Sequence, residues 1–149
     1  MENFRILMVD DDQDILWICQ MVLSDEGFSI DISNDPREAL QKTMSEGYHI
    51  FILDYVMPYI LGDELAKEIL AINNDAVFIF LTGHNEFYDI SKSLNCNSYL
   101  ILLKPVDEQQ LLKAVREKVE YLNYLNETRE LLSKSPDHQQ LLFENTKQQ

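Results

Sequence analysis

Charged residues stand directly after three of the short apolar runs in this chain. Asp10, Asp11 and Asp12 follow one run, Asp54 follows another and Lys104 follows a third. The carboxyl ends of parallel strands meet at one edge of a sheet, so these residues would share a pocket if the runs were parallel strands. Mg²⁺ prefers oxygen ligands, and a lysine offsets phosphate charge. The spacing therefore predicts a pocket for a hard cation and a phosphoryl group.

Helix capping is a simpler role for these acids. Carboxylates at the start of a helix interact favourably with its dipole, which accounts for Asp12 and Asp14. Capping does not account for Asp10 and Asp11, because they directly follow a buried run where like charges repel unless a cation lies between them. Asp54 could cap a turn on its own. We favour the cation pocket and keep capping as the alternative.

Five continuous apolar runs predict the strands. They lie at residues 4–9, 28–32, 50–53, 77–81 and 99–103. A continuous run is typical of a strand that is buried on both faces of a parallel sheet. Amphipathic stretches predict helices at residues 13–26, 36–46, 63–72 and 85–94, and from residue 107 onward. Since right-handed crossovers would place helices on both faces, we expect an α/β fold with a doubly wound, five-stranded parallel sheet.

Local signals mark where two of these helices begin. Asp35, Pro36 and Glu38 have the spacing of an N-cap, a first helical residue and a capping-box acid. Asp107, followed by Gln110, repeats the pattern. These signals support the helix starts that the apolar spacing predicts.

Length and charge narrow the class of protein. A chain of 149 residues can form one α/β domain with a single core. Its 12 Lys and Arg against 26 Asp and Glu give a formal net charge of −14, which opposes contact with nucleic acid or an anionic membrane. No apolar run approaches the roughly 20 residues that span a bilayer, and we expect no secretion signal. We therefore expect a cytoplasmic protein with protein partners.

Four motifs match a known family in order and spacing. They are Val9-Asp10-Asp11-Asp12, Leu53-Asp54-Tyr55-Val56-Met57-Pro58 with Gly62, Leu81-Thr82-Gly83, and Leu103-Lys104-Pro105. With these motifs, residues 3–120 resemble the receiver domain of bacterial two-component response regulators. One motif would be weak evidence, but four on successive strand ends are specific. The resemblance implies the flavodoxin-like receiver topology, and a phosphorylation-dependent signalling switch that accepts a phosphoryl group from a histidine kinase or a phosphotransfer protein.

The resemblance also implies a metal site with defined ligands. Asp54 would be the phosphoacceptor and a metal ligand, and Asp11 would bind Mg²⁺ directly. Asp10 would act partly through water. The backbone carbonyl of Val56 would complete the protein's share of the coordination.

Phosphate recognition falls to the remaining motifs. Lys104 would pair with the acyl phosphate and, together with Asp54, carry out the transfer. Thr82 and the backbone amide of Gly83 would bind the phosphate and report its presence. The peptide bond before Pro105 is cis in the family. Such a domain catalyses only its own phosphorylation and dephosphorylation and is not otherwise an enzyme.

Three positions depart from the family pattern. The family usually has an aromatic residue three before the lysine, which couples Thr82 to the output surface, but this chain has Ile101 there. Tyr99 lies on the same side of the predicted strand, so the switch could use Tyr99, Ile101 or another route. Val56 and His84 occupy positions that tune how water reaches the phosphate. The apolar Val56 predicts a long-lived phosphorylated state, while for His84 we favour an exposed imidazole without a function.

The last helix is predicted to continue beyond the sheet. Leu112, Val115, Val119 and Leu122 follow heptad spacing, but only about two heptads hold, too few for a coiled coil. The expected parts are a receiver domain at residues 1–120, a helical extension or signalling linker at 121–134, and a flexible tail at 135–149.

Leucines in this extension predict self-association. Leu122, Leu125 and Leu132 would project into water, where each costs on the order of 1.5–3 kcal/mol relative to burial. A partner helix would cover them. We therefore expect a weak homodimer through the C-terminal helix, interrupted by Asn126 and Arg129.

Two other classes of protein share parts of this pattern. A phosphatase of the haloacid dehalogenase type also begins with acids after a strand and forms an aspartyl phosphate, but it has no use for Asp54. A flavodoxin-like FMN binder shares the layout. It should have a phosphate loop rich in Ser, Thr and Gly after the first strand, where this chain has three aspartates that would repel phosphate.

Overall fold

The structure is a computed structural model that describes residues 3–83, 87–95 and 98–134. The strands are β1 (Arg5–Val9), β2 (Ser29–Ser33), β3 (Ile50–Asp54), β4 (Val77–Thr82) and β5 (Tyr99–Leu103). The helices are α1 (Gln13–Asp25), α2 (Pro36–Ser45), α3 (Gly62–Ile72), α4 (Phe87–Ser93) and α5 (Glu108–Ser133). His84, predicted to be an exposed imidazole, and residues 135–149, predicted to be a flexible tail, lie outside the described residues.

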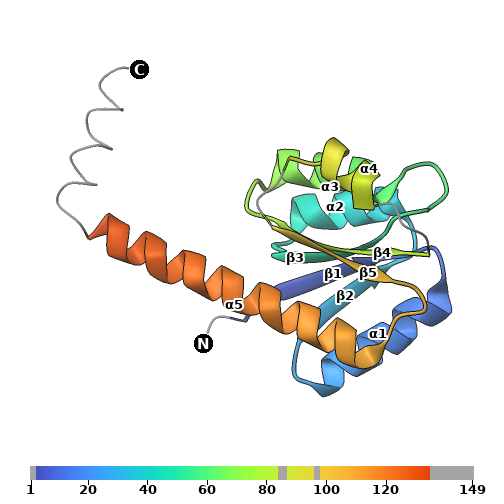
Figure 1. The fold of residues 1–149 in the computed structure, drawn as a ribbon, viewed down its shortest axis with the longest axis horizontal. Coiled ribbons are helices and arrows are strands. Elements are labelled where there is room, and N and C mark those ends of the chain that lie inside the picture. Colours follow the sequence, from blue (N-terminus) through green and yellow to red (C-terminus); the bar gives the residue numbers. More distant parts are fainter. Residues whose placement is uncertain (1–2, 84–86, 96–97, 135–149) are drawn as a thin grey trace. The chain divides into compact units, whose positions relative to one another are not determined.

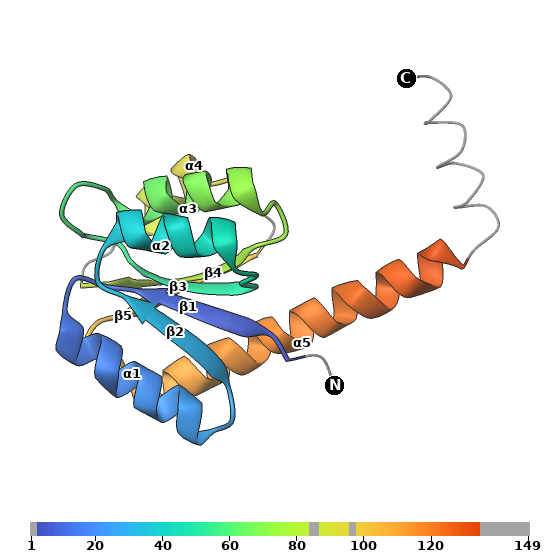
Figure 2. The same ribbon diagram turned by 180° about the vertical axis from the view of Figure 1, so that it is seen from behind.

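The five strands form one parallel sheet in the order β2-β1-β3-β4-β5. Helices α2, α3 and α4 cover one face, and α1 and the start of α5 cover the other (Figures 1 and 2). This arrangement confirms the predicted doubly wound α/β fold with an extended C-terminal helix. It also places the carboxyl ends of all strands at one edge.

The core explains why the central strands are continuously apolar. Both β3 and β4 are buried along their whole length. The ring of Phe78 lies between those of Phe51 and Phe80, with centroids 5.7 and 5.9 Å away. Aromatic pairs at such separations add to the stability gained from burial. The rigid centre of the sheet therefore supports the strand ends.

Aspartates begin three of the helices. Asp12 accepts hydrogen bonds from the amides of Asp14 and Ile15 at the start of α1. Asp107 accepts from the amide of Gln110 at the start of α5. Capping is therefore confirmed for Asp12 and Asp107, and Asp35 does the same for α2.

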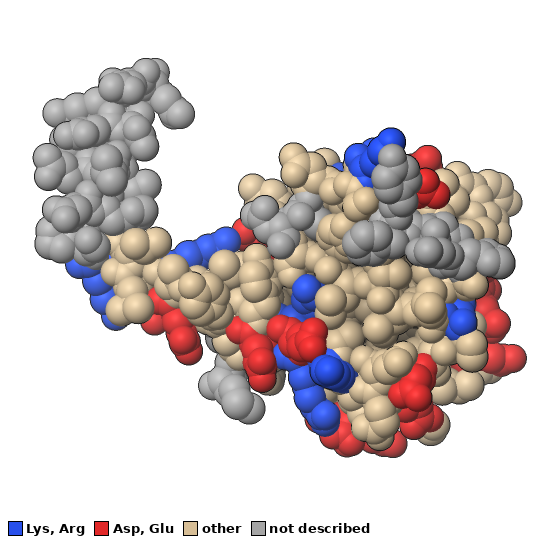
Figure 3. Space-filling model, viewed as in Figure 1, with Lys and Arg blue, Asp and Glu red and all other residues tan. Residues whose placement is uncertain are grey.

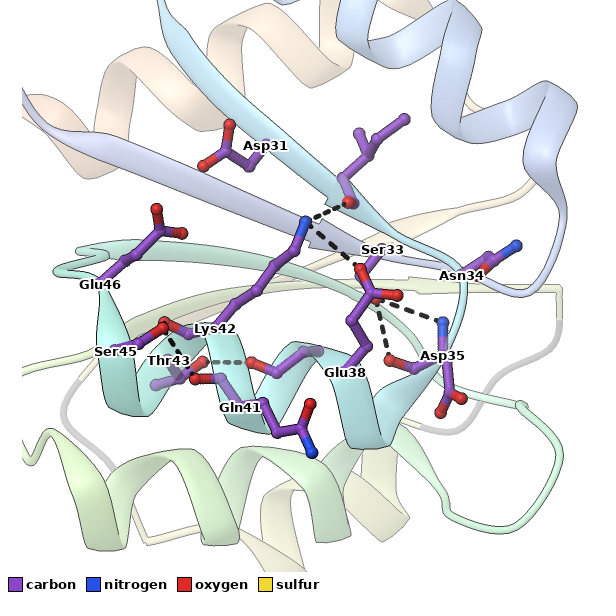
Figure 4. Close-up of polar contacts among 12 residues, drawn as sticks. Asp31, Ser33, Asn34, Asp35, Glu38, Gln41, Lys42, Thr43, Ser45 and Glu46 are labelled. Carbon is purple, nitrogen blue, oxygen red and sulfur yellow. Dashed lines mark hydrogen bonds and ion pairs between the residues drawn. The ribbon is translucent and has the colours of Figure 1, made fainter.

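The predicted capping-box role of Glu38 was wrong. Figure 4 shows that Glu38 pairs instead with Lys42, one turn further along α2, at 3.3 Å. Lys42 also donates to the carbonyl of Ile32 at 3.2 Å. The amide of Asp35, which Glu38 would have bound, donates to Ser33 Oγ at 3.3 Å. An attractive i,i+4 ion pair and a neighbouring hydroxyl thus replace the local motif.

The described residues form two compact units that divide after Val115, within α5. The buried side chains of α5 include Leu111, Lys118 and Leu122. The expectation that Leu122 lies in water was therefore wrong, because helical periodicity keeps it on the same face as Leu111 and Lys118. The exposed large apolar residues of α5 are Tyr124, Leu131 and Leu132. Among the helices described, none has the length and apolarity to cross a membrane.

Gly62 begins α3 where the chain passes close to the end of β3. A Cβ atom at Gly62 would lie 2.6 Å from the backbone carbonyl oxygen of Asp54 and 3.0 Å from Tyr55 Cα. The Gly62 amide donates to the carbonyl of Tyr55 at 2.7 Å. Only a residue without a side chain allows this approach, which holds the backbone of Asp54 in place.

We expect Gly62→Ala to lower the free energy of unfolding by about 1–3 kcal/mol, because backbone atoms must move to admit the methyl group. Gly47→Ala is the matched control, since a Cβ there meets nothing within 4 Å. Its effect should stay within about 1 kcal/mol. Urea denaturation of both variants measures the difference, and equal losses would contradict the steric account.

Candidate functional site

Strand pairing brings residues from separate motifs to one edge of the sheet. β1 and β3 are neighbours, with Val9 beside Leu53, so Asp10 follows next to Asp54. From β1 the sheet is extended first by β2 on one side and then by β3, β4 and β5 on the other. Open α/β sheets bind ligands at such a reversal, between the two strands where it occurs. At the end of β4, the carbonyl of Thr82 accepts a hydrogen bond of 2.7 Å from the backbone amide of Lys104, the residue that follows β5.

Three carboxylates and one ammonium group meet in the candidate site. Asp10, Asp11 and Asp54 each offer an oxygen, and these atoms lie within 4.8 Å of one another. Lys104 Nζ lies 3.2 Å from Asp10 Oδ2 and 3.0 Å from Asp54 Oδ1. Asp10 and Asp54 are buried, whereas Asp11 is exposed. When all four groups are ionised, negative charge exceeds positive charge.

Burial makes the ionised forms of two of these acids unfavourable. It raises the pKa of Asp54 to about 6, although the hydrogen bond from Lys104 opposes the shift, and the charge of Asp10 adds to it. Burial also raises the pKa of Asp10, against the opposing effects of the Asp12 amide and Lys104. The protein thus holds carboxylates that lack enough positive charge around them.

Burial acts on the pKa of Lys104 in the opposite direction to its effect on the acids. Burial by itself would lower the pKa of its ammonium group. The hydrogen bond to Asp54 and the charge of Asp10 outweigh that effect, so the pKa of Lys104 lies above its ordinary value. Lys104 therefore stays charged at neutral pH and cannot act there as a base.

The donor set fits Mg²⁺. Its members are carboxylate oxygens, which are hard ligands, and two oxygens bound to one Mg²⁺ lie at most about 4.2 Å apart because each bond is about 2.1 Å. The oxygens of Asp10, Asp11 and Asp54, within 4.8 Å of one another, need only small movements to reach that geometry. The exposure of Asp11 leaves one side open to water and to a phosphoryl group.

The other residues predicted for the site lie at or just after the ends of β3 and β4. Thr82 is buried at the end of β4, and Gly83 follows it on the surface. Val56 pairs with Leu61 in an isolated antiparallel bridge and exposes its side chain. The Lys104-Pro105 peptide bond is cis, as the resemblance implied. The contributions of Thr82, Gly83 and Val56 to binding phosphate or metal remain predictions.

Tyr99 and Ile101 lie on the same side of β5, as predicted. Both pack against the buried cluster that includes Phe80. The Tyr99 ring meets Phe80 edge to face, with centroids 6.1 Å apart, and Ile101 pairs with Phe80 in the sheet register. Since Thr82 lies two residues after Phe80, it faces the same side. The geometry therefore leaves both residues as candidates for the switch.

Two features beside the site were not predicted from the sequence. The Asp12 amide donates to Asp10 Oδ1 at 2.9 Å and so orients that carboxylate. Tyr59 has a φ of 77° and lies with Asp11 and Arg37 around a cavity. The bulky residue directly after Pro58 was the sequence signal that could have drawn attention to Tyr59. No local sequence signal predicts that Arg37 lies beside the site.

Comparison with known proteins identifies the family. The family model of the response regulator receiver domain matches residues 6–116, which is most of the chain. The chain belongs to the response regulator receiver domain family. This finding agrees with the resemblance and gives no support to a haloacid dehalogenase-type phosphatase, a reading that left Asp54 without a role.

Named relatives agree with this result. The response regulator ArlR of Staphylococcus epidermidis is 32% identical over 112 residues, which are 75% of this chain and 51% of ArlR. The CpxR homolog of Haemophilus influenzae, a transcriptional regulatory protein, is 33% identical over 112 residues, which are 75% of this chain and 48% of the homolog. The chain thus spans about half the length of these relatives.

A solved structure shares the receiver architecture. The CheY-like response regulator receiver domain protein of Methanospirillum hungatei has a TM-score of 0.73 and 28% sequence identity. The match covers 83% of this chain and 98% of that protein. The receiver domain therefore accounts for the sheet and the helices that cover it.

The raised pKa of Asp54 predicts how stability depends on pH when metal is absent. Between about pH 4 and pH 6 the folded state holds a proton that the unfolded state has lost, so stability falls as pH rises through this window. Asp54→Asn removes this loss. We expect it to stabilise the protein by about 1–2 kcal/mol at pH 7 and by little near pH 4.

Urea denaturation with a chelator across this pH range tests the prediction. Asp25→Asn, which changes an exposed carboxylate at the end of α1, is the control. Equal effects of the two substitutions at pH 7, or a loss of stability in Asp54→Asn, would contradict the account.

Proposed function

We propose that this receiver domain is a signalling switch that takes a phosphoryl group onto Asp54 in the presence of Mg²⁺. The donor would be a phosphohistidine of a histidine kinase or a phosphotransfer protein. The observation that carries this proposal is the burial of Asp54 beside two other carboxylates and 3.0 Å from the Lys104 ammonium. A nucleophile, a cation site and a fixed positive charge are the groups that phosphoryl transfer needs.

The residues would divide the reaction between them. A carboxylate oxygen of Asp54 attacks phosphorus as the bond to the donor nitrogen breaks. Asp10, Asp11, Asp54 and the carbonyl of Val56 would hold Mg²⁺, which when bound offsets charge on the phosphoryl oxygens. Lys104, already within reach of Asp54, would turn its ammonium to a phosphoryl oxygen. The domain would then catalyse only its own phosphorylation and dephosphorylation.

The phosphorylated state would be recognised at the end of β4. The Thr82 hydroxyl and the Gly83 amide are our candidates for hydrogen bonds to the new phosphate. Thr82 faces the same side of the sheet as Tyr99 and Ile101. A movement of Thr82 towards the phosphate would open space for one of these side chains to move, and so change the surface at β5.

The surface of the compact unit that ends at Val115 has apolar residues that suit protein partners. Trp17, Ile18 and Met21 on α1 are large apolar residues that are more than half exposed. Figure 3 shows basic side chains scattered over the face in view, without a continuous basic stripe across its described residues. Together with the net charge of −14, this supports a cytoplasmic role with protein partners rather than binding to nucleic acid or a membrane.

The C-terminal part would connect the switch to a partner copy. We place the receiver at residues 1–120 and a helical linker at 121–134. The exposed side chains of Tyr124, Leu131 and Leu132 are apolar surface without a role in the receiver. A parallel homodimer through this part of α5 would cover them, and phosphorylation would shift its affinity.

We expect Asp54→Asn to abolish covalent labelling by a small phosphodonor, because an amide is nearly isosteric with the carboxylate but is not a nucleophile. The wild-type chain should take one hydroxylamine-labile phosphoryl group that depends on Mg²⁺. Thr82→Ala is the comparison variant and should keep the label while losing the downstream response. Intact-mass measurement with peptide mapping gives the result. Full labelling of the Asn variant would move the phosphoacceptor elsewhere, and repeated turnover without a stable label would favour a phosphatase.

We expect Leu131→Ser combined with Leu132→Ser to weaken the homodimer by at least about 100-fold, because each leucine buried in a dimer contributes roughly 1.5–3 kcal/mol. Glu130→Ser, an exposed position in the same turn, is the control. Sedimentation equilibrium with and without a phosphodonor measures the affinity. If the wild-type chain stays monomeric in both conditions, the helix is a linker only.

A further inference from the structure

The cavity bordered by Tyr59, Asp11 and Arg37 opens directly beside the acidic cluster. It has a volume of about 220 Å³, and its walls include Asp11, Asn34, Arg37, Pro58 and Tyr59. Asp11 belongs to both the cavity and the acidic cluster, where its oxygen lies within 4.8 Å of oxygens of Asp10 and Asp54. A molecule that delivers a phosphoryl group to Asp54 could therefore place its other end in this cavity.

Tyr59 in the wall of this cavity is strained and exposed. Its φ of 77° lies in the left-handed region, which bulky side chains rarely adopt. Its side chain gains little from burial, because Tyr59 is 90% exposed. Folding therefore does not explain a tyrosine here, and an exposed strained residue beside a reactive group points to a binding role.

Arg37 holds the ring of Tyr59 from one side. The guanidinium carbon lies 5.3 Å from the ring centroid, within the range of a cation–π contact. Asp35 fixes the guanidinium through hydrogen bonds to its Oδ1 and Oδ2 atoms at 3.2 and 3.1 Å. Asp35 is itself fixed because it caps α2. The Tyr59 ring thus lies beside Asp11 in contact with Arg37, which Asp35 orients.

We propose that this cavity seats the planar leaving group of an N-phosphorylated imidazole donor, with the Tyr59 ring stacked against it. The inference rests on the proposed function, since it concerns the donor for Asp54. With its other ring nitrogen protonated, an N-phosphorylated imidazole carries an N–H that can donate to Asp11, and its flat face suits an aromatic wall. The leaving group of an acyl phosphate is a carboxylate, which Asp11 would repel.

The transfer balances without a further reactant. An Asp54 carboxylate oxygen forms a bond to phosphorus as the phosphorus–nitrogen bond breaks. The electron pair of that bond stays on the ring nitrogen. The donor reacts in the form whose other ring nitrogen is protonated, so the group leaves as neutral imidazole and no further proton is needed.

The experiment compares donors that differ in their leaving group. Phosphorylation rates of Asp54 are measured with N-phosphoimidazole, with a phosphohistidine peptide and with acetyl phosphate, at saturating Mg²⁺. We expect Tyr59→Ala to slow transfer from both imidazole donors about fivefold, the scale of a lost aromatic contact, and to change acetyl phosphate less than about twofold. Tyr59→Phe keeps the ring and should restore the rate. Met44→Ala, which removes another exposed large side chain near the end of α2, is the control.

Binding of free imidazole gives a readout independent of transfer. Titration followed by NMR should shift the amides of Arg37 and Tyr59 in the wild-type chain, and Tyr59→Ala should weaken the binding. Equal slowing with all donors, sensitivity to the peptide alone, or no shift at these amides would overturn the inference. If the wild-type chain takes label from no donor, the proposed function itself fails.

Discussion

The structure depends on the convergence of three carboxylates on one ammonium group at the carboxyl edge of a parallel sheet. The pairing of β1 with β3 places Asp10 beside Asp54, and both are buried. Burial raises the pKa of each acid, and Lys104 compensates only part of the charge. Such a cluster is unfavourable by itself and becomes less so when a divalent cation binds between the carboxylates. The same imbalance that costs stability thus favours the binding of a cation.

The surrounding framework keeps this unfavourable cluster in place. Central strands that are buried along their length fix the positions of the strand ends. The close approach of Gly62 to the Asp54 carbonyl and the hydrogen bond from the Asp12 amide to Asp10 orient the acids. These restraints act only on the residues of the site. The energetic cost of holding like charges together is therefore offset by packing in the rest of the fold.

Continuous apolar runs made the central strands predictable, because these strands are buried on both faces. The receiver topology was predicted from the resemblance to the family. The acids and Lys104 could be placed at one edge because the carboxyl ends of parallel strands meet there. The contact of Arg37 with Tyr59 was not predictable, because it joins α2 to the loop between β3 and α3 and local spacing carries no information about such a contact. Two other predictions each failed within a single helix. Glu38 pairs with Lys42 one turn further along α2, and Leu122 is buried on the face of α5 that it shares with Leu111.

The most direct test of the electrostatic account is thermal unfolding of the wild-type chain and of Asp11→Asn at neutral pH, with a chelator and then with saturating Mg²⁺. A cation that binds only the folded state must raise its stability. The account predicts that Mg²⁺ raises the unfolding temperature of the wild-type chain well beyond the effect of NaCl at equal ionic strength. It predicts that Asp11→Asn loses most of this gain. An equal gain in both proteins, or no gain beyond that of NaCl, would contradict it.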